Sequence, residues 1–395
     1  MKSFSFLVVA AMIFVAAMTS CTDNVINPKE YTVTFDSKGG SDVEAQTVNE
    51  YGKVTKPADP FWVGYTFVAW YRETACTNEW MFDTDVVTAD MTLYAKWIEN
   101  EEIVGIENIS FENYPLVDGS TSASVLNTMI ACKLLGIRYF WLAPGIFTDW
   151  TLRPQMDDIP EQYKNFFGTR IKSSQTHGAF MNLIDGTADI ILTHRTISPD
   201  EKVHAAAVGV TLIETPIALD AFVFVVNKKN PVKSLNVEQI QKIYIGEITN
   251  WSEVGGNNAN MKVFTRPRNS GSEEVLRELV MGGLEPAEFP ESGIGGMYLV
   301  FVEVLQNENG ICYTFNNYKD MQARVPDSEV PKIAINGIFP DENTVINRTY
   351  PFISEVHVAI RSDLSRNSMA YKLYEWLRTE KVKPILTECG FIPKY

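Results

Sequence analysis

The sequence predicts an α/β protein in which a small β module precedes a larger α/β domain. From about Ile109 onward, apolar strand-like runs alternate with runs of helical periodicity, which is the pattern of α/β folds. Ahead of them, residues 31–97 contain short alternating and aromatic runs separated by turn signals, as strands of a compact β unit do. At 395 residues the chain is long enough for two or three domains.

The charge and the cysteines narrow the classes of ligand. A formal net charge of −15 argues against nucleic acid and against an anionic membrane surface, because both select basic faces. It does not exclude a small anion, which helix starts and hydroxyl groups can hold. No pair of cysteines has metal-ligand spacing, so we expect no metal and no cofactor. Cys312 and Cys389 could form a disulfide, and buried free thiols are the alternative.

The N-terminus is predicted to be an export signal. Lys2 is followed by an apolar run from Phe6 to Met18, which is too short to span a bilayer. Small residues then precede Cys21 in a pattern that resembles the bacterial lipobox. The resemblance implies a signal peptide at 1–20, lipidation of Cys21, a tether at 21–30 and a lipid-anchored, extracytoplasmic place in the cell envelope. The alternative is an ordinary signal peptide with Cys21 incidental.

Residues 31–98 are predicted to be one β module. An alternating strand at 31–35 is followed by Gly39-Gly40, an aromatic run at 61–71 and the closing run at 92–97. These residues resemble the Listeria–Bacteroides repeat, a β-grasp-like module of surface proteins, which implies a spacer or adhesive role. We interpret the aromatics as core rather than as a ligand patch, because so small a unit needs them to bury enough surface. Acidic residues 99–108 are predicted to be a linker.

Three helix starts in the large domain have the same design. Residues 118–124, 173–179 and 266–272 each place Gly, Ser or Thr just before an apolar-periodic helix. Such a start offers unpaired N–H groups and a positive dipole end, and Arg266 and Arg268 stand beside the third. Ordinary helix capping is the alternative, since Ser270 with Glu273 already has the spacing of a capping box. The residues alone leave an anion site and simple capping both open.

The large domain also resembles the phosphate-binding proteins of Pst-type ABC transporters. The segment Gly246-Glu-Ile-Thr-Asn-Trp251 followed by Gly255-Gly256, and Arg266 with Ser270-Gly271-Ser272, carry this resemblance most specifically. It implies a two-lobed periplasmic-binding-protein fold of the type II kind over residues 109–395. Lobe 1 would comprise about 109–217 plus 350–395, and lobe 2 about 218–349, with hinge strands near 218–222 and 350–354. An insert at 136–168 would be a lid or a packing loop.

The resemblance also implies a set of ligand-binding residues on both lobes. Arg266 would supply the positive charge, since an Arg fork suits a tetrahedral oxyanion. The hydroxyl and backbone donors would come from Ser120, Thr121, Thr176 or His177 in its place, Ser270, Gly271 and Ser272.

One position departs from the family pattern. Well-studied members carry an Asp where this sequence has His194, and that Asp accepts the proton of phosphate and so excludes sulfate. His194 is either a site residue or a structural histidine, and Arg195 beside it would join the site. Asp118 or Asp220 would be a substitute acceptor. Oxyanion binding is therefore predicted more firmly than selectivity for phosphate.

The leading hypothesis is a membrane-anchored, monomeric solute-binding protein that captures phosphate or a similar oxyanion for ABC-type uptake or sensing. A permease would then be its protein partner. The alternative is a cell-surface adhesion protein that uses the repeat module and keeps the binding-protein fold as a scaffold. No local catalytic signature is found, so we expect no enzyme.

Overall fold

The computed structural model describes residues 29–57, 59–60, 62, 65–99, 105–142, 149–289 and 294–394. They form two compact units that divide after Ile98. Within these ranges, no helix combines the length and the apolar character that crossing a membrane requires. The expected signal peptide and Cys21 lie outside the described residues, so the lipidation of Cys21 stays a prediction.

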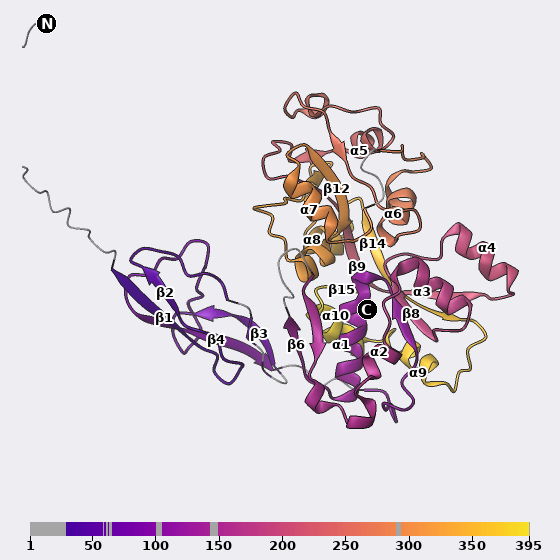
Figure 1. Cartoon of the computed structure of the whole chain (residues 1–395), viewed down its shortest axis with the longest axis horizontal. Coiled ribbons are helices and arrows are strands. Elements are labelled where there is room, and N and C mark those ends of the chain that lie inside the picture. The colour runs from indigo at the N-terminus through magenta and orange to yellow at the C-terminus, as the bar shows by residue number, and fades with distance from the viewer. Residues whose placement is uncertain are drawn as a thin grey trace, which may run out of the picture. The chain divides into compact units, whose positions relative to one another are not determined.

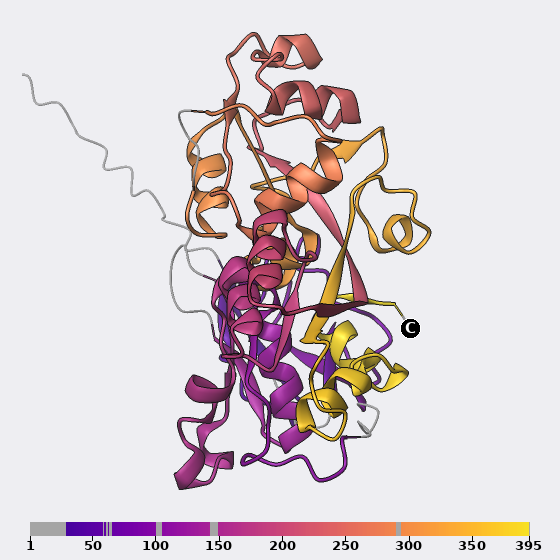
Figure 2. The ribbon, with the colours of Figure 1, turned by 90° about the vertical axis from the view of Figure 1, so that its right-hand side faces the viewer.

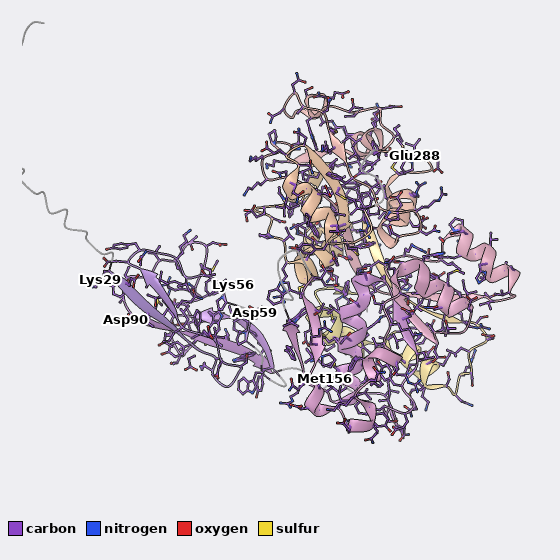
Figure 3. All side chains as sticks on the ribbon, in the orientation of Figure 1. Lys29, Lys56, Asp59, Asp90, Met156 and Glu288 are labelled. Carbon is purple, nitrogen blue, oxygen red and sulfur yellow. The ribbon has the colours of Figure 1, made fainter. Side chains whose placement is uncertain are left out.

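The first unit is a four-stranded sheet in the order β2-β1-β4-β3. Its strands are β1 Glu30–Asp36, β2 Gln46–Asn49, β3 Tyr65–Tyr71 and β4 Met91–Glu99. The first and last strands pair in parallel at the centre of the sheet, and β2 adds antiparallel to β1. Asp90, labelled in Figure 3, accepts a hydrogen bond from the Thr32 backbone N–H at 2.7 Å and so joins the turn before β4 to β1. The expected small β module is confirmed.

Aromatic side chains contribute much of the apolar core of this first unit. Trp70 and Trp80 are almost fully buried with Val33 and Leu93. The ring of Phe35 meets Trp70 edge-on at 4.9 Å between centroids. These contacts agree with the interpretation of the aromatics as core.

The second unit contains the strands β5 to β15. Their bounds are β5 Val117–Gly119, β6 Tyr139–Leu142, β7 Thr151–Pro154, β8 Ile190–Thr193, β9 Leu212–Val226, β10 Ser234–Leu235, β11 Lys262–Val263, β12 Gly310–Phe315, β13 Ala334–Ile335, β14 Ile353–Arg361 and β15 Ile392–Pro393.

The second unit also contains α-helices and shorter helical segments. The α-helices are α1 Ser124–Leu135, α2 Phe166–Arg170, α3 Gln175–Ile184, α4 Pro199–Ala207, α5 Val237–Tyr244, α6 Gly271–Val275, α7 Leu299–Gln306, α8 Glu342–Ile346, α9 Met369–Trp376 and α10 Lys383–Glu388. Short 3₁₀ segments are η1 Thr121–Ala123, η2 Met156–Asp158, η3 Glu161–Tyr163, η4 Trp251–Val254 and η7 Glu380–Val382, and η5 Leu276–Val280 and η6 Tyr318–Ala323 are π-helical turns.

Two strands run the length of this unit. The sheet order is β11-β12-β9-β14-β8-β5, with β9 and β14 antiparallel at its centre (Figures 1 and 2). One apolar core gathers residues between 219 and 353, and a second gathers residues 114–218 together with 356–391. The two cores define two lobes, here called lobe 1 (the second core) and lobe 2 (the first core). The segments expected as hinges, 218–222 and 350–354, lie where β9 and β14 pass between the cores, and the exact lobe boundaries stay a prediction.

Helix ends follow the expected chemistry with one exception. Gly136 ends α1 in the left-handed conformation, with φ of 68°, and Ser198 with Glu201 forms the capping box of α4. At α6, Ser270 accepts a hydrogen bond from the Glu273 N–H, as expected. The reciprocal bond, from the Ser270 N–H to the Glu273 carboxylate, is absent among the described contacts. The Ser270 N–H donates to the Pro267 carbonyl at 3.1 Å, and the carboxylate is engaged elsewhere.

The insert expected at 136–168 packs against lobe 2. It contributes the β6–β7 hairpin, and the Trp150 N–H donates to the Gln322 carbonyl of η6 at 2.8 Å. The Arg324 guanidinium lies 4.9 Å from the ring centroid of Trp141 and 4.0 Å from that of Trp150. In its described part the insert is therefore a packing element. Cys76, Cys132, Cys312 and Cys389 are buried and free, which favours the free-thiol alternative.

Candidate functional site

The N-terminal ends of α3 and α6 meet across the two lobes. Gly271, the first residue of α6, lies so close to Thr176 of α3 that a Cβ at position 271 would collide with the Thr176 hydroxyl oxygen. Each start is preceded or opened by a residue with positive φ: Gln175 at 62° and Asn269 at 68°. Such conformations are uncommon outside glycine and cluster at functional sites. Two helix starts, where backbone N–H groups lack intrahelical partners, are thus brought together.

Arg266 is a buried cation that has no ion pair among the described residues. The residue is only 8% exposed, and its Nη2 donates to the Gly295 carbonyl at 3.4 Å. Nε and Nη1 are buried and have no hydrogen-bond partner among the described residues. Burial lowers the pKa of the guanidinium from its ordinary value, as removal of a cation from water does.

The carboxylate of Glu273 acts on Arg266 electrostatically but is paired with a different arginine. Glu273 accepts from Arg277 Nε at 2.9 Å and also from the Tyr313 hydroxyl. The backbone of Arg266 is held by the same tyrosine, because its N–H donates to the Tyr313 hydroxyl oxygen at 2.9 Å. Among the described residues, Arg266 thus keeps two positioned donor nitrogens, Nε and Nη1, without a partner, which is the chemistry of an anion site.

Ser120 lies at the carboxyl edge of the parallel pair β5 and β8. Its N–H donates to the Leu192 carbonyl at 3.0 Å, and its Oγ lies 3.1 Å from the Oγ of Ser122. The Ser122 hydroxyl is in turn 2.8 Å from His194 Nδ1, and His194 Nε2 lies 3.5 Å from Asp220 Oδ2. His194 is thus joined to Ser120 through Ser122.

The π-helical turn η6 connects this serine cluster to the region of Arg266. Gln322 Nε2 donates to the Ser122 carbonyl at 2.8 Å, across the two lobes. Tyr318, one turn earlier in η6, interacts electrostatically with Arg266. The turn η6 therefore contacts Ser122 of lobe 1 and lies close to Arg266 of lobe 2.

Arg195 is engaged by a buried carboxylate. Its Nη1 and Nη2 donate to the two oxygens of Glu201, each at 2.8 Å, and both side chains are at most 2% exposed. His177 Nδ1 lies 2.9 Å from the same carboxylate, and its ring is 40% exposed. Arg195 Nη2 also donates to the Asn269 carbonyl of lobe 2 at 3.4 Å. Arg195 and His177 therefore converge on Glu201, next to the start of α6.

Asp118 holds the start of α3 in place. Its Oδ1 accepts from the N–H groups of Gly119 and Ser174, at 2.7 and 2.9 Å, and its Oδ2 accepts from Asn182 Nδ2 at 2.7 Å. Both oxygens are used in this way, so Asp118 is a weaker candidate for a substitute acceptor than Asp220. One oxygen of Asp220, Oδ2, is buried without a hydrogen bond among the described residues.

The remaining expected residues have local roles in addition to their place near the site. Ser270 caps α6, Ser272 is 4% exposed within its first turn, and Thr121 is half buried in η1. Sequence reasoning missed Ser122, Glu201 and Gln322. Glu201 carried a signal only as part of the capping box of α4, and its partners lie outside that motif. No group of three described His, Cys, Asp or Glu side chains has a metal-binding arrangement.

Comparison with known proteins defines the class to which this fold and site belong. Residues 147–379 match the PBP superfamily domain, and the chain belongs to that superfamily. Residues 31–96 match the Listeria-Bacteroides repeat domain. Both expected resemblances are confirmed.

Among individual relatives, the phosphate-binding protein PstS of Bacillus subtilis is 25% identical over 184 residues, which are 46% of this chain and 58% of that protein. Protein SphX of Synechococcus elongatus is 25% identical over 261 residues, 62% of this chain and 75% of that protein. A Clostridium perfringens protein crystallised with bound phosphate has a TM-score of 0.51 and 24% identity, over 71% of this chain and 98% of that chain. This last likeness shows the fold.

The repeat module has relatives of a different kind. A protein of Evansella cellulosilytica is 41% identical over 103 residues, which are 26% of this chain and only 11% of that protein. The chain therefore spans about a tenth of that relative and little more than half of the Bacillus subtilis PstS.

Proposed function

We propose that residues 109–395 form a solute-binding domain that captures phosphate or a similar oxyanion between its two lobes. The observation that carries this proposal is Arg266, a buried guanidinium beside two facing helix starts, with two donor nitrogens that have no partner among the described residues. An unpaired buried cation is costly, and an anion that accepts its hydrogen bonds would remove that cost. The phosphate-binding names of the Bacillus subtilis relative and of its homologues support the choice of ligand.

The remaining contacts follow from this placement. Arg266 would bind the anion directly. Further hydrogen bonds to the anion would involve Ser120, Thr121 and Thr176 from lobe 1 and Ser270, Gly271 and Ser272 from lobe 2. We assign Arg195 and His177 to Glu201 and to the support of the α6 start, because their polar atoms already meet that carboxylate. His194 would act through Ser122. Ligand capture would proceed by closure of the lobes, without a chemical step.

Isothermal titration tests this proposal most directly. The protein starting at Thr22 is unfolded and refolded to free it of bound anion, and phosphate and then sulfate are added. Micromolar or tighter binding of phosphate is expected. Failure to bind either anion would overturn the proposed function and would favour the adhesion hypothesis for the repeat module.

We further propose that the protein is anchored at the outer side of a membrane through a lipid on Cys21 and serves an ABC permease or a sensor. Replacing Cys21 by Ser is expected to move the protein from the detergent phase to the aqueous phase in a detergent-partition assay, because the acyl chains supply the membrane affinity. Cys76→Ser is the matched control and is expected to stay in the detergent phase, since Cys76 is buried in the β module. An unchanged partition of Cys21→Ser would contradict the anchor.

A further inference from the structure

The strongest unassigned feature is a pair of buried polar atoms that face each other. His194 Nε2 and Asp220 Oδ2 are 3.5 Å apart, and neither has a hydrogen bond among the described residues. The residues are 1% and 4% exposed. The rings of Phe315 and Phe391 lie against the imidazole, with centroids 4.5 and 5.4 Å away. In such an apolar setting the two atoms have only each other to satisfy them.

The hydrogen-bond directions along this chain of groups can be derived. The directions hold for an imidazole that carries one ring proton. A carboxylate only accepts, so that proton lies on Nε2, the nitrogen that faces Asp220. Nδ1 is then an acceptor, and the Ser122 hydroxyl, 2.8 Å away, donates to it. Because Ser122 has a single hydroxyl hydrogen, the 3.1 Å contact with Ser120 must be a hydrogen bond donated by Ser120.

The result is that Ser120 Oγ offers only lone pairs to any further partner. Its N–H is also used, on the Leu192 carbonyl. An oxyanion oxygen that carries a proton can donate to Ser120 Oγ, whereas an oxygen without a proton would meet it lone pair against lone pair.

We propose that Ser120 Oγ accepts a hydrogen bond from a protonated oxygen of the bound oxyanion, and that Asp220, His194 and Ser122 fix it in this role. This chain of hydrogen bonds from Asp220 through His194 and Ser122 to Ser120 is here called the relay. It would make the site select hydrogenphosphate, which carries a proton at neutral pH, over sulfate, which carries none. This inference rests on the proposed function. Ser120 contacts the ligand, and the other three are positioning residues. The relay from Asp220 thus makes Ser120 Oγ the acceptor for the proton of the anion, a role that a carboxylate could take directly.

Asp220→Asn tests the direction of the relay. The Asn carbonyl oxygen can keep the hydrogen bonds that Asp220 Oδ1 accepts from the N–H groups of Ala221 and Asn317, at 2.8 and 3.0 Å. Its amide would donate to Nε2 and move the imidazole proton to Nδ1. Nδ1 would then donate to the Ser122 hydroxyl. Ser120 would no longer have to donate to Ser122, and its hydroxyl hydrogen could point toward the anion. The ratio of phosphate to sulfate affinity is expected to fall at least about tenfold, with weaker phosphate and stronger sulfate binding.

Ser122→Ala interrupts the relay without touching the hinge strand that carries Asp220, and Ser122→Thr restores the hydroxyl. The first is expected to lose selectivity by a similar factor and the second to regain it. Asp118→Asn is the matched control, because it removes the same charge from a buried Asp whose oxygens are used by Gly119, Ser174 and Asn182. Asp118→Asn is expected to leave the ratio of phosphate to sulfate affinity unchanged. If the loss of any buried charge altered selectivity, this variant would lose selectivity as well.

Titration of phosphate and sulfate into each variant at pH 7 separates the outcomes. Equal weakening of both anions in Asp220→Asn and Ser122→Ala would overturn the relay and leave the oxyanion site standing. Equal affinity of the unaltered protein for both anions would overturn it as well. If the unaltered protein binds neither anion, the proposed function fails and the relay fails with it.

Discussion

Replacing Arg266 by Met is expected to weaken phosphate binding at least about a hundredfold, because truncating one partner of a buried, hydrogen-bonded charge pair costs roughly 2–5 kcal/mol. Met keeps the length and the apolar stem of the side chain, so the loss would come from the guanidinium alone. Isothermal titration of the anion-free protein measures the effect. Arg268→Met is the matched control, because Arg268 is an exposed arginine in the same loop, and its affinity is expected to change by no more than about threefold.

The same substitution has the opposite expected effect on stability in the absence of anion. Within the described part of the chain, Nε and Nη1 of the buried Arg266 have no partner, and burial lowers the pKa of the guanidinium. The ligand-free fold therefore holds a cation without full compensation. Arg266→Met is therefore expected to leave the free energy of unfolding unchanged or to raise it by about 1 kcal/mol or more. Urea denaturation with and without phosphate checks this. Phosphate at a hundred times its Kd should stabilise the unaltered protein by about 2.7 kcal/mol and the variant hardly at all.

Two results would contradict the assignment of Arg266. Retained phosphate affinity in Arg266→Met would remove this residue from the site. A marked loss of stability without anion would show that the guanidinium has a structural partner and is not held in readiness for a ligand.

The fold could be predicted from the sequence where local patterns determine it. The apolar run at 221–226, the Ser198–Glu201 capping box and Gly136 at the end of α1 are all signals within a few residues. Strand β2 has no such signal, since Gln46–Asn49 is short and alternates weakly, and its pairing with β1 decides its conformation.

The site was predicted in part. Arg266 and the start of α6 stand in one short motif, so a sequence pattern could find them. The relay from Ser120 to Asp220 could not be found in this way, because Ser122, His194 and Asp220 are distant in the chain and meet only through the pairing of β5, β8, β14 and β9. The Ser270–Glu273 spacing was misleading at Glu273. An i,i+4 ion pair with Arg277 and a hydrogen bond from the Tyr313 hydroxyl engage the carboxylate instead of the capping contact.

The second large effect is expected at Arg195. Its buried guanidinium has a bidentate carboxylate partner in Glu201, whereas Arg266 has no ion pair among the described residues. Arg195→Met would leave the Glu201 carboxylate, with a side chain 0% exposed, without its bidentate partner. Breaking a buried ion pair from one side costs about 3–5 kcal/mol. In a domain of this size that corresponds to a fall in Tm of roughly 10 °C. Differential scanning calorimetry of the anion-free protein measures it.

A compensating change isolates the cause. Arg195→Met combined with Glu201→Gln removes both charges and keeps an acceptor for the Ser198 N–H, which donates to Glu201 at 2.8 Å. The double variant is expected to recover most of the lost stability, since replacement of a whole buried pair is often close to neutral. Equal stability of the single and the double variant would contradict the ion-pair explanation.

Acid should weaken this pair in the unaltered protein. Burial by itself would raise the pKa of Glu201, but the hydrogen bonds and the charge of Arg195 outweigh it and hold the pKa below its ordinary value of 4.5. A carboxyl whose folded pKa is depressed contributes stability above its unfolded pKa and loses it as the pH falls through the folded pKa. The unaltered protein is therefore expected to lose more stability between pH 6 and pH 3 than the double variant, which has no carboxyl at position 201.

The two arginines can also be told apart by ligand affinity. If Arg195 supports the α6 start through Glu201 and the Asn269 carbonyl, Arg195→Met should weaken phosphate binding only about tenfold or less, and the double variant should recover part of it. If Arg195 touches the anion, the loss should match that of Arg266→Met and the double variant should recover none. A stability loss with modest loss of affinity at Arg195, set against the reverse at Arg266, would assign structural support to the paired cation and ligand binding to the unpaired one.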